Sequence, residues 1–314
     1  MEKFIQYMQG KNFSIATQQM YLRSVNEFLE WIEKEETRIT KKDVLKYLEY
    51  LKKQRALKNI SRKMQLTGIN HYFTFLYHSE QITQNPCSFL KIRGISKISL
   101  YKTFTEEQLT ELFDNYYTIF VKNYDYTRTP PNRLIETRLN KERNAVILSL
   151  FINQGTTTKE IDKMLLQDID LTKATIKVRG GKRSNERNLQ LKAEQIGLLM
   201  NYIQHIRPQF LTSTNQESEK LFFPYPNTGN QKSKNPESLM DLFKPLTAQV
   251  KTIEQHFLNF KQIRASVITN WLKVHGLRKT QYMAGHRYIR GTEYYLPNNL
   301  EDLTNDISKH HPFF

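Results

Sequence analysis

The chain has 314 residues, of which 39% are hydrophobic, so it is long enough to build more than one buried core. Its 47 Lys and Arg residues outnumber its 31 Asp and Glu residues and give a net charge of +16, a balance typical of nucleic-acid-binding proteins. Because Cys87 is the only cysteine, a disulfide framework within the chain and a cysteine-based zinc site are both excluded.

The hydrophobic segments of the sequence are too short to cross a membrane. The most apolar run, residues 145–152, is less than half of what a bilayer span requires, and the first residues contain no apolar signal segment. We therefore expect a soluble, cytoplasmic protein that has no membrane partner.

The first hundred residues show the periodicity of a helical bundle. Ser14 precedes apolar positions that recur every three to four residues, and Thr40 with Asp43 has the spacing of a capping box. A further helical pattern runs from about Ser61 to His78. These patterns predict a bundle of about four helices.

A basic segment without amphipathic periodicity, residues 91–104, separates this bundle from the rest of the chain. Such a composition is typical of a linker that follows a charged partner. We therefore predict a helical DNA-binding domain over 1–96, a linker over 97–104 and a second domain over 105–314.

The second domain is predicted to be mainly α-helical with a small β-hairpin. Thr105 and Gln108 predict its first helix start, and a polar stretch from about 122 to 140 predicts a loop. Alternating residues over 174–178 and 188–191 predict two strands around the basic loop RGGKRSNER. Helical periodicity predicts helices over 142–153, 158–166, 193–206, 236–246, 262–275, 278–284 and 300–309.

Residues suited to phosphate chemistry follow one another in this domain. They are Glu160 in QGTTTKE, Lys182 in the hairpin loop, Lys261 and Arg264 in KQIR, His286 in AGH, and Tyr295 in GTEYY, nine residues after the histidine. A phenol has a pKa of about 10 and must lose its proton to attack a phosphodiester. Cations are needed around a phosphate that gathers negative charge, and the fork of Arg264 can hold two of its oxygens.

In this order and spacing the sequence resembles the tyrosine recombinase, or phage integrase, family over nearly its whole length. The most specific features are the AGH motif with its spacing to Tyr295 and the hairpin VRGGKRSNERNLQL. The C-terminal NDISKHHPF is similar to the tail of integrases from some mobile elements. The resemblance implies a SAM-like core-binding domain followed by a catalytic domain.

The same resemblance implies an activity. The chain is expected to be a site-specific DNA recombinase that cleaves and rejoins double-stranded DNA through a 3′-phosphotyrosyl bond to Tyr295, without metal or other cofactor. Arg264, His286 and Lys261 are expected to contact the phosphate, Lys182 to protonate the leaving 5′ hydroxyl, and Glu160 to orient the cations. Four protomers are expected on two DNA sites, with the last helix, 300–309, docking in trans.

The sequence departs from the family pattern at two positions. Lys261 occupies the place of a histidine, and Thr157 occupies the place of the first catalytic arginine. The loss of one charge-assisted phosphate contact weakens transition-state binding by several kcal/mol in comparable sites. Another cation, such as Lys159, Arg143 or Arg138, compensates for it, or catalysis is impaired.

Other interpretations of these residues stay open. Lys159, Arg143 and Arg183 are candidates for DNA phosphate contacts outside the reacting centre. A DNA-binding protein that keeps the recombinase fold but no longer cuts is the main alternative, and an RNA-binding or architectural protein would explain only the charge. Asp168 and Asp170 are interpreted as turn residues rather than ligands of a two-metal nuclease site.

Overall fold

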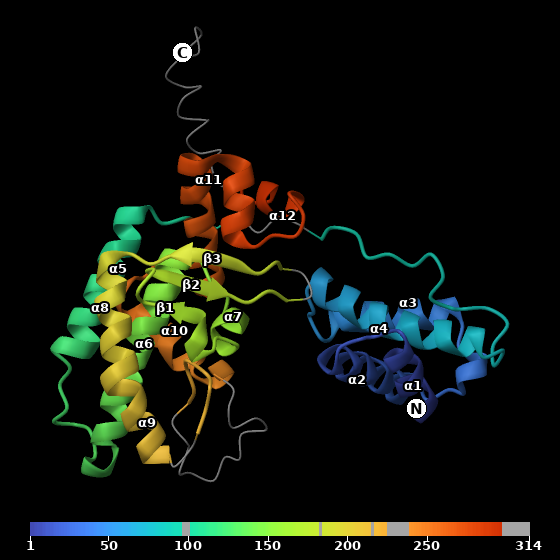
Figure 1. The fold of residues 1–314 in the computed structure, drawn as a ribbon. Coiled ribbons are helices and arrows are strands. Elements are labelled where there is room, and N and C mark those ends of the chain that lie inside the picture. The colour runs from blue at the N-terminus through green and yellow to red at the C-terminus, as the bar shows by residue number, and fades with distance from the viewer. Residues whose placement is uncertain (96–100, 182–183, 215–216, 225–238, 297–314) are drawn as a thin grey trace, which may run out of the picture. The chain divides into compact units, whose positions relative to one another are not determined.

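The computed structural model describes residues 1–95, 101–181, 184–214, 217–224 and 239–296 (Figure 1). The chain forms two compact units, 1–99 and 100–314. No helix in the described part of the chain is long and apolar enough to cross a membrane.

Unit 1 is a four-helix bundle, as the sequence predicts. Its helices are α1 (Glu2–Gly10), α2 (Ile15–Ile32), α3 (Lys41–Lys53) and α4 (Asn59–His78), with a short 3₁₀ turn at Glu36–Arg38. The long helices α2 and α4 pack along each other. Helix α1 has no counterpart in the sequence prediction, and its buried Phe4 stacks edge-on against Tyr72 of α4.

The capping residues of unit 1 lie where the sequence places them. The Ser14 hydroxyl accepts a hydrogen bond from the Thr17 amide, and the Asp43 carboxylate accepts from both the amide and the hydroxyl of Thr40. These bonds satisfy amides that have no partner within the first turn of a helix. Local chemistry therefore fixes where α2 and α3 begin.

Unit 2 is mainly helical and carries one small antiparallel sheet. Its α-helices are α5 (Glu106–Tyr117), α6 (Leu134–Gln154), α7 (Thr158–Asp162), α8 (Ala193–Asn201), α9 (Arg207–Thr214), α10 (Phe243–Ile253), α11 (Phe260–Ala284) and α12 (Arg290–Glu293). Shorter helical turns lie at Thr118–Lys122, Pro131–Arg133, Leu166–Asp168, Tyr202–Ile206 and Leu239–Asp241. The strands are β1 (Ile169–Asp170), β2 (Thr175–Val178) and β3 (Arg187–Gln190), in the order β1-β2-β3.

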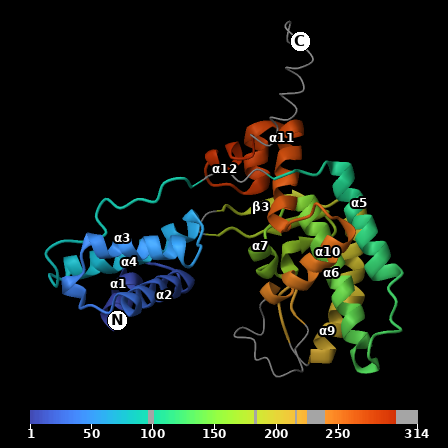
Figure 2. The same cartoon turned by 180° about the vertical axis from the view of Figure 1, so that it is seen from behind.

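Helix α6 is the centre of unit 2, and Figure 2 shows it among its neighbouring helices from behind. Its residues 145–152 are all buried, so this second half of the helix is surrounded by protein on every side. It contacts α5, α8 and α11, and the Phe151 ring stacks on Phe260 of α11 with ring centroids 4.4 Å apart. This packing positions the C-terminal end of α6 beside α11.

Three predicted segments of unit 2 have different bounds in the structure. The predicted loop over 122–140 is wrong from Leu134 on, because Pro131 begins a 3₁₀ turn that leads into α6, whose Leu139 is fully buried. Helix α7 ends at Asp162 rather than at 166. Helix α10 begins at Phe243, while 236–238 of the predicted helix lie outside the described residues.

The predicted break between two C-terminal helices is confirmed at Gly276. Helix α11 passes through this residue with φ 69° and ψ 179°, a backbone conformation that glycine adopts without the cost of a Cβ. The hairpin strands are also confirmed, with Ile176 opposite Leu189 across β2 and β3. The mostly helical fold with a small sheet therefore agrees with the sequence prediction.

Candidate active site

The start of helix α7 carries the carboxylate of the site. Thr157 is the N-cap: its hydroxyl accepts a hydrogen bond from the Glu160 amide at 3.2 Å, and its own amide donates to Glu160 Oε2 at 2.7 Å. This reciprocal pair is a capping box. The position at which the family resemblance leads us to expect an arginine is therefore a helix cap in this protein.

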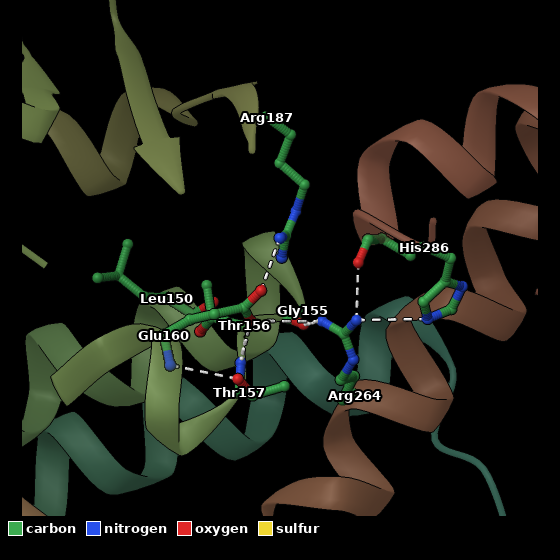
Figure 3. Close-up of polar contacts among 9 residues, drawn as sticks. Leu150, Gly155, Thr156, Thr157, Glu160, Arg187, Arg264 and His286 are labelled. Atoms are coloured by element: carbon green, nitrogen blue, oxygen red, sulfur yellow. Dashed lines mark hydrogen bonds and ion pairs between the residues drawn. The ribbon is translucent and has the colours of Figure 1, made fainter. Parts of the chain in front are cut away.

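Arg187, on strand β3, reaches Glu160 from the sheet (Figure 3). Its Nη1 donates to Glu160 Oε1 at 2.7 Å, and the whole residue is only 2% exposed. Strand β3 alternates buried and exposed residues, so Arg187 points inward in phase with Leu189. A buried ion pair thus joins the sheet to α7.

Arg264 extends from α11 into the same cluster (Figure 3). Its Nη1 donates to the carbonyl of Gly155, and its Nη2 donates to the carbonyl of Ala284 at 2.7 Å. The same Nη1 lies 3.7 Å from Glu160 Oε2. The guanidinium is therefore fixed between the end of α6 and the end of α11.

Glu160 is ionised in this environment. Burial raises the pKa of its carboxyl, but the hydrogen bond and charge of Arg187 and the charge of Arg264 outweigh burial and lower the pKa below its ordinary value. Two guanidinium groups thus share one carboxylate inside the protein.

His286 follows directly after the C-cap of α11. Gly285, the cap, has φ 69°, and a Cβ there would lie 2.6 Å from Arg187 Nη1, so both the backbone and the space require glycine. Burial and the positive charges of Arg264 and Arg187 lower the pKa of His286 to about 4. The imidazole is therefore neutral at neutral pH.

The contacts of His286 define its tautomer. Its Nε2 lies 3.4 Å from Arg264 Nη2, and its Nδ1 lies 2.9 Å from the hydroxyl of Thr292. Because a guanidinium can only donate, Nε2 is the accepting nitrogen and Nδ1 carries the proton, which it donates to Thr292. The buried Thr292 of α12 thus orients the ring.

Tyr295 lies against His286 and packs on α11 of the same chain. The two rings are parallel within 5°, with centroids 5.8 Å apart. Tyr295 also packs against the cluster of Ile268, Leu272 and Ala284. Burial raises the pKa of its hydroxyl although the nearby charge of Arg264 lowers it, so the phenol is protonated in this arrangement.

The loop of the hairpin, between β2 and β3, is tied to the segment that carries His286. The Asn185 amide donates to the Gly285 carbonyl at 2.8 Å, and Ser184 forms a β-bridge with His286. Lys182, which the sequence predicts as the proton donor to the leaving group, and Arg183, which it predicts as a DNA phosphate contact, lie outside the described residues. The return strand of the hairpin therefore meets the site directly.

Two other predicted site residues, Lys261 and Lys159, lie on the helices that carry Arg264 and Glu160. Lys261 is exposed one turn before Arg264 on α11, and Lys159 is exposed next to Glu160 on α7. Both are close to the site in the chain, and their phosphate contacts stay predictions.

Arg143 and Arg138 do not reach the site. Arg143 is fully buried and donates to the carbonyl of Phe223 at 2.9 Å, while Arg138 donates to the side chain of Gln209. At 1.5 Å per residue, the helix rise places Arg143 roughly 18 Å before Gly155 along α6. The structure does not support either residue as a replacement for the arginine missing at Thr157, nor Arg143 as a phosphate contact.

Sequence reasoning missed Arg187 and the cap at Thr157. The signal for Arg187 is an arginine two positions before Leu189 in an alternating strand, which places it on the inward face. The predicted strand began one residue later, at 188, and therefore left it out. The signal for the cap is the spacing of Thr157 and Glu160, the same as at Thr40 and Asp43.

Asp168 and Asp170, outside this cluster, hold turns of the backbone. Asp168 accepts from the Leu165 amide and from Arg179 Nε, and Asp170 accepts from the Lys173 amide. In the part of the chain that the structure describes, no three His, Cys, Asp or Glu residues are grouped so that they could hold a metal ion. The chemistry that the described cluster offers is therefore that of two guanidinium groups, an imidazole and a phenol.

Comparison with known proteins relates this geometry to a family. The chain is similar to the tyrosine recombinase XerC of Listeria welshimeri, with 22% identity over 99% of this chain and 97% of the relative. Its fold is similar to the XerH site-specific recombinase bound to a palindromic difH substrate, with TM-score 0.67 and 16% identity over 95% of this chain and 81% of the other. It is also similar to a lambda integrase in a tetramer bound to a Holliday junction, with TM-score 0.58 and 12% identity over 91% and 76%.

Two family descriptions match the chain directly. Residues 1–82 match the phage integrase N-terminal SAM-like domain, and residues 131–301 match the phage integrase family. The second match covers more than half of the chain and includes Glu160, Arg264, His286 and Tyr295. The chain therefore belongs to the phage integrase family of tyrosine recombinases.

Proposed function

We propose that this protein is a site-specific DNA recombinase whose nucleophile is Tyr295. The observation that carries the assignment is the convergence of Arg264, His286 and Tyr295 from α11 and the segment that follows it. The Tyr295 ring is parallel to His286, and His286 Nε2 lies 3.4 Å from the Arg264 guanidinium. A phenol, a neutral imidazole and a fixed cation at one point are the groups that phosphoryl transfer to tyrosine requires.

The reaction follows from these groups. The Tyr295 oxygen forms a bond to the phosphorus of the scissile phosphate, its proton passes to solvent water, and the bond to the 5′ oxygen breaks. Arg264 is the cation that stabilises the charge on the non-bridging oxygens, and Lys182 gives a proton to the departing 5′ oxygen, which becomes a hydroxyl. Ligation is the reverse reaction with another 5′ hydroxyl, so no nucleotide is consumed.

The non-catalytic alternative is less well supported. A protein that only binds DNA has no need for a tyrosine held against a neutral histidine, or for the histidine to be oriented by the fully buried Thr292. The threonine at position 157 favours the alternative. Its role as the N-cap of α7 explains why a threonine is there, and the cluster of Arg264, His286 and Tyr295 is present all the same.

Covalent trapping tests the proposal. A binding site is first selected from a random duplex library, and nicked suicide duplexes of that site are incubated with wild type and Tyr295→Phe. We expect a denaturant-stable adduct from wild type and none from the variant, because only Tyr295 supplies the attacking oxygen. Tyr294→Phe is the matched control and should still form the adduct.

Two outcomes would contradict the assignment. Tight binding without an adduct from wild type would favour the non-catalytic protein, and an adduct from Tyr295→Phe would place the nucleophile elsewhere. DNA affinity of the variant separates loss of chemistry from loss of binding. That affinity should fall steeply with salt, because phosphate contacts dominate it.

We propose further that four protomers act on two DNA sites and that residues 300–309 of one protomer dock on the next. A groove on unit 2 lined by Leu109, Ile152, Trp271 and Val274 supports this assembly, since Val274 is 73% exposed within it. The likeness to a lambda integrase in a tetramer supports it too. The docking residues themselves lie outside the described part of the chain.

Truncation after Pro297 tests the assembly. We expect the shortened protein to bind one DNA site with unchanged stability but to lose cooperative binding and strand exchange. Val274→Asp in the full chain should reproduce the loss of cooperativity, because it introduces a charge into the groove. Unchanged recombination by the truncated protein would count against docking in trans.

A further inference from the structure

The charges at the candidate active site do not cancel one another. Among the described residues, Arg187 and Arg264 each bring a positive charge, Glu160 brings a negative one, and His286 is neutral. The cluster therefore holds one net positive charge. A scissile phosphate carries one negative charge in the ground state and more in the transition state, so this net charge is available to it.

Arg187 determines that balance. It makes the closer contact with Glu160, at 2.7 Å, whereas Arg264 is 3.7 Å from the other carboxylate oxygen. If Arg187 were absent, the ion pair of Glu160 would be with Arg264, and the cation that faces the substrate would be neutralised. In a buried site such a pair is poorly screened by solvent.

The burial of Arg187 makes its role electrostatic and positional. Its side chain has no exposed surface, and its Nε and Nη2 find no acceptor among the described residues. A buried guanidinium with unmatched donors is costly, which calls for an explanation beyond packing. Its Nη1 lies against Gly285, next to His286, so its field acts on the residues around the reacting phosphate.

We propose that Arg187 supplies the second positive charge of the active site, acting from strand β3 in place of a cation at position 157. It is a positioning residue: it neutralises Glu160, which caps α7, and so leaves the charge of Arg264 for the phosphate. This inference rests on the proposed recombinase function. It explains how the site keeps a net positive charge although Thr157 has none.

A charge-reversal cycle with single-turnover cleavage of the suicide duplex tests this role. Arg187→Gln should cleave about 100-fold more slowly than wild type, the effect of removing one stabilising group from a comparable site. Arg187→Gln combined with Glu160→Gln should recover most of that loss, because the double variant has the net charge of wild type. The double variant also removes the unpaired buried carboxylate, so it folds if the single variant does not.

A neutral substrate separates electrostatics from structure. In a duplex whose scissile phosphate has one non-bridging oxygen replaced by a methyl group, less charge needs to be stabilised. The difference between wild type and Arg187→Gln should therefore shrink to less than about 10-fold on this duplex, as the lost charge stabilisation no longer applies. Arg143→Gln, which removes the other buried arginine, should cleave both duplexes at the wild-type rate per folded molecule.

The outcomes are distinct. Wild-type cleavage by Arg187→Gln, an equal loss on both duplexes, or no recovery in a folded double variant would each overturn the role of Arg187. If wild type itself forms no adduct on a duplex that it binds, the proposed recombinase function fails instead. Thr157→Arg in the Arg187→Gln background should also restore cleavage, since it returns a cation to the vacant position.

Discussion

Arg143 and Arg187 are both fully buried arginines of unit 2, yet their surroundings differ. Arg143 lies in the core of α6, donates to the Phe223 carbonyl and the Asn144 side chain, and packs near the Phe210 ring. Arg187 lies on β3 and faces a carboxylate that a second guanidinium shares. Burial lowers the pKa of Arg143 to about 10, its two Nη atoms donate to neutral oxygens, and its Nε finds no acceptor among the described residues.

This difference shows that a buried charge does not by itself mark an active site. The groups around the charge decide, and at Arg187 they are the carboxylate of Glu160 and the imidazole of His286, on which the charge of Arg187 acts. In the sequence, Arg143 lies on a strongly helical segment and attracts attention as a cation near Glu160, whereas Arg187 follows a loop full of basic residues. In the tertiary structure, Arg187 lies at the candidate active site and Arg143 does not.

The largest expected effect comes from Arg264, the cation next to His286. Arg264→Gln should slow cleavage roughly 1000-fold, because it removes the guanidinium fixed between the Gly155 and Ala284 carbonyls. Single-turnover adduct formation measures the effect, and DNA affinity should change little. Retention of more than a tenth of the wild-type rate would show that Arg264 is not the phosphate ligand.

Arg143 should affect stability instead of chemistry. Arg143→Met leaves the buried Phe223 carbonyl without its donor, which should lower the free energy of unfolding by about 1–3 kcal/mol. Denaturant unfolding measures this loss. A changed cleavage rate per folded molecule would contradict the separation of the two arginines.

Acid should destabilise the protein through His286. Its pKa is about 4 in the folded state and near 6.5 when unfolded, so the unfolded state binds the proton first and stability falls as pH drops from about 6.5 to about 4. His286→Gln should lose less thermal stability between pH 7 and pH 5 than wild type. In the variant, only the pH dependence of stability that is due to His71 and other groups should remain. A variant whose stability depends on pH as steeply as that of wild type would contradict this role of His286.

The smallest expected effect concerns the cap of α7. Thr157→Val keeps the shape of the side chain but removes the oxygen that accepts from the Glu160 amide, at a cost of about 1 kcal/mol. Thr157→Ser keeps that oxygen and should match wild type in thermal unfolding. Equal stability of the valine variant would show that the capping box contributes nothing measurable.

Much of the fold was predictable because its signals are local. The caps at Ser14, Thr40 and Thr105 depend on residues within one helical turn, and each begins a helix in the structure. The break at Gly276 is predictable for the same reason. The start of α6 was missed because its first turns are largely exposed, with Leu134 and Ile135 on the surface and Leu139 in the core, so they show no clear apolar stripe.

Part of the site was predictable as well. Arg264, His286 and Tyr295 lie within 32 consecutive residues, and their spacing is enough to suggest that they meet. The hydrogen bond between His286 and Thr292 spans only six residues, and it fixes the ring locally. The meeting of Arg264, His286 and Tyr295 thus follows from a short stretch of chain.

The sequence by itself determined the two-domain helical organisation, the caps and the order of the reacting residues, because each depends on neighbours in the chain. Only the tertiary structure brings Arg187 to Glu160 and Arg264, and its proposed role rests on these contacts. Arg187 follows Glu160 by 27 residues, and Arg264 follows Arg187 by a further 77. The fold must therefore bring together three charges that are far apart in the chain. The packing of β3, α7 and α11 around α6 brings these charges together, and no local rule of the sequence specifies that packing.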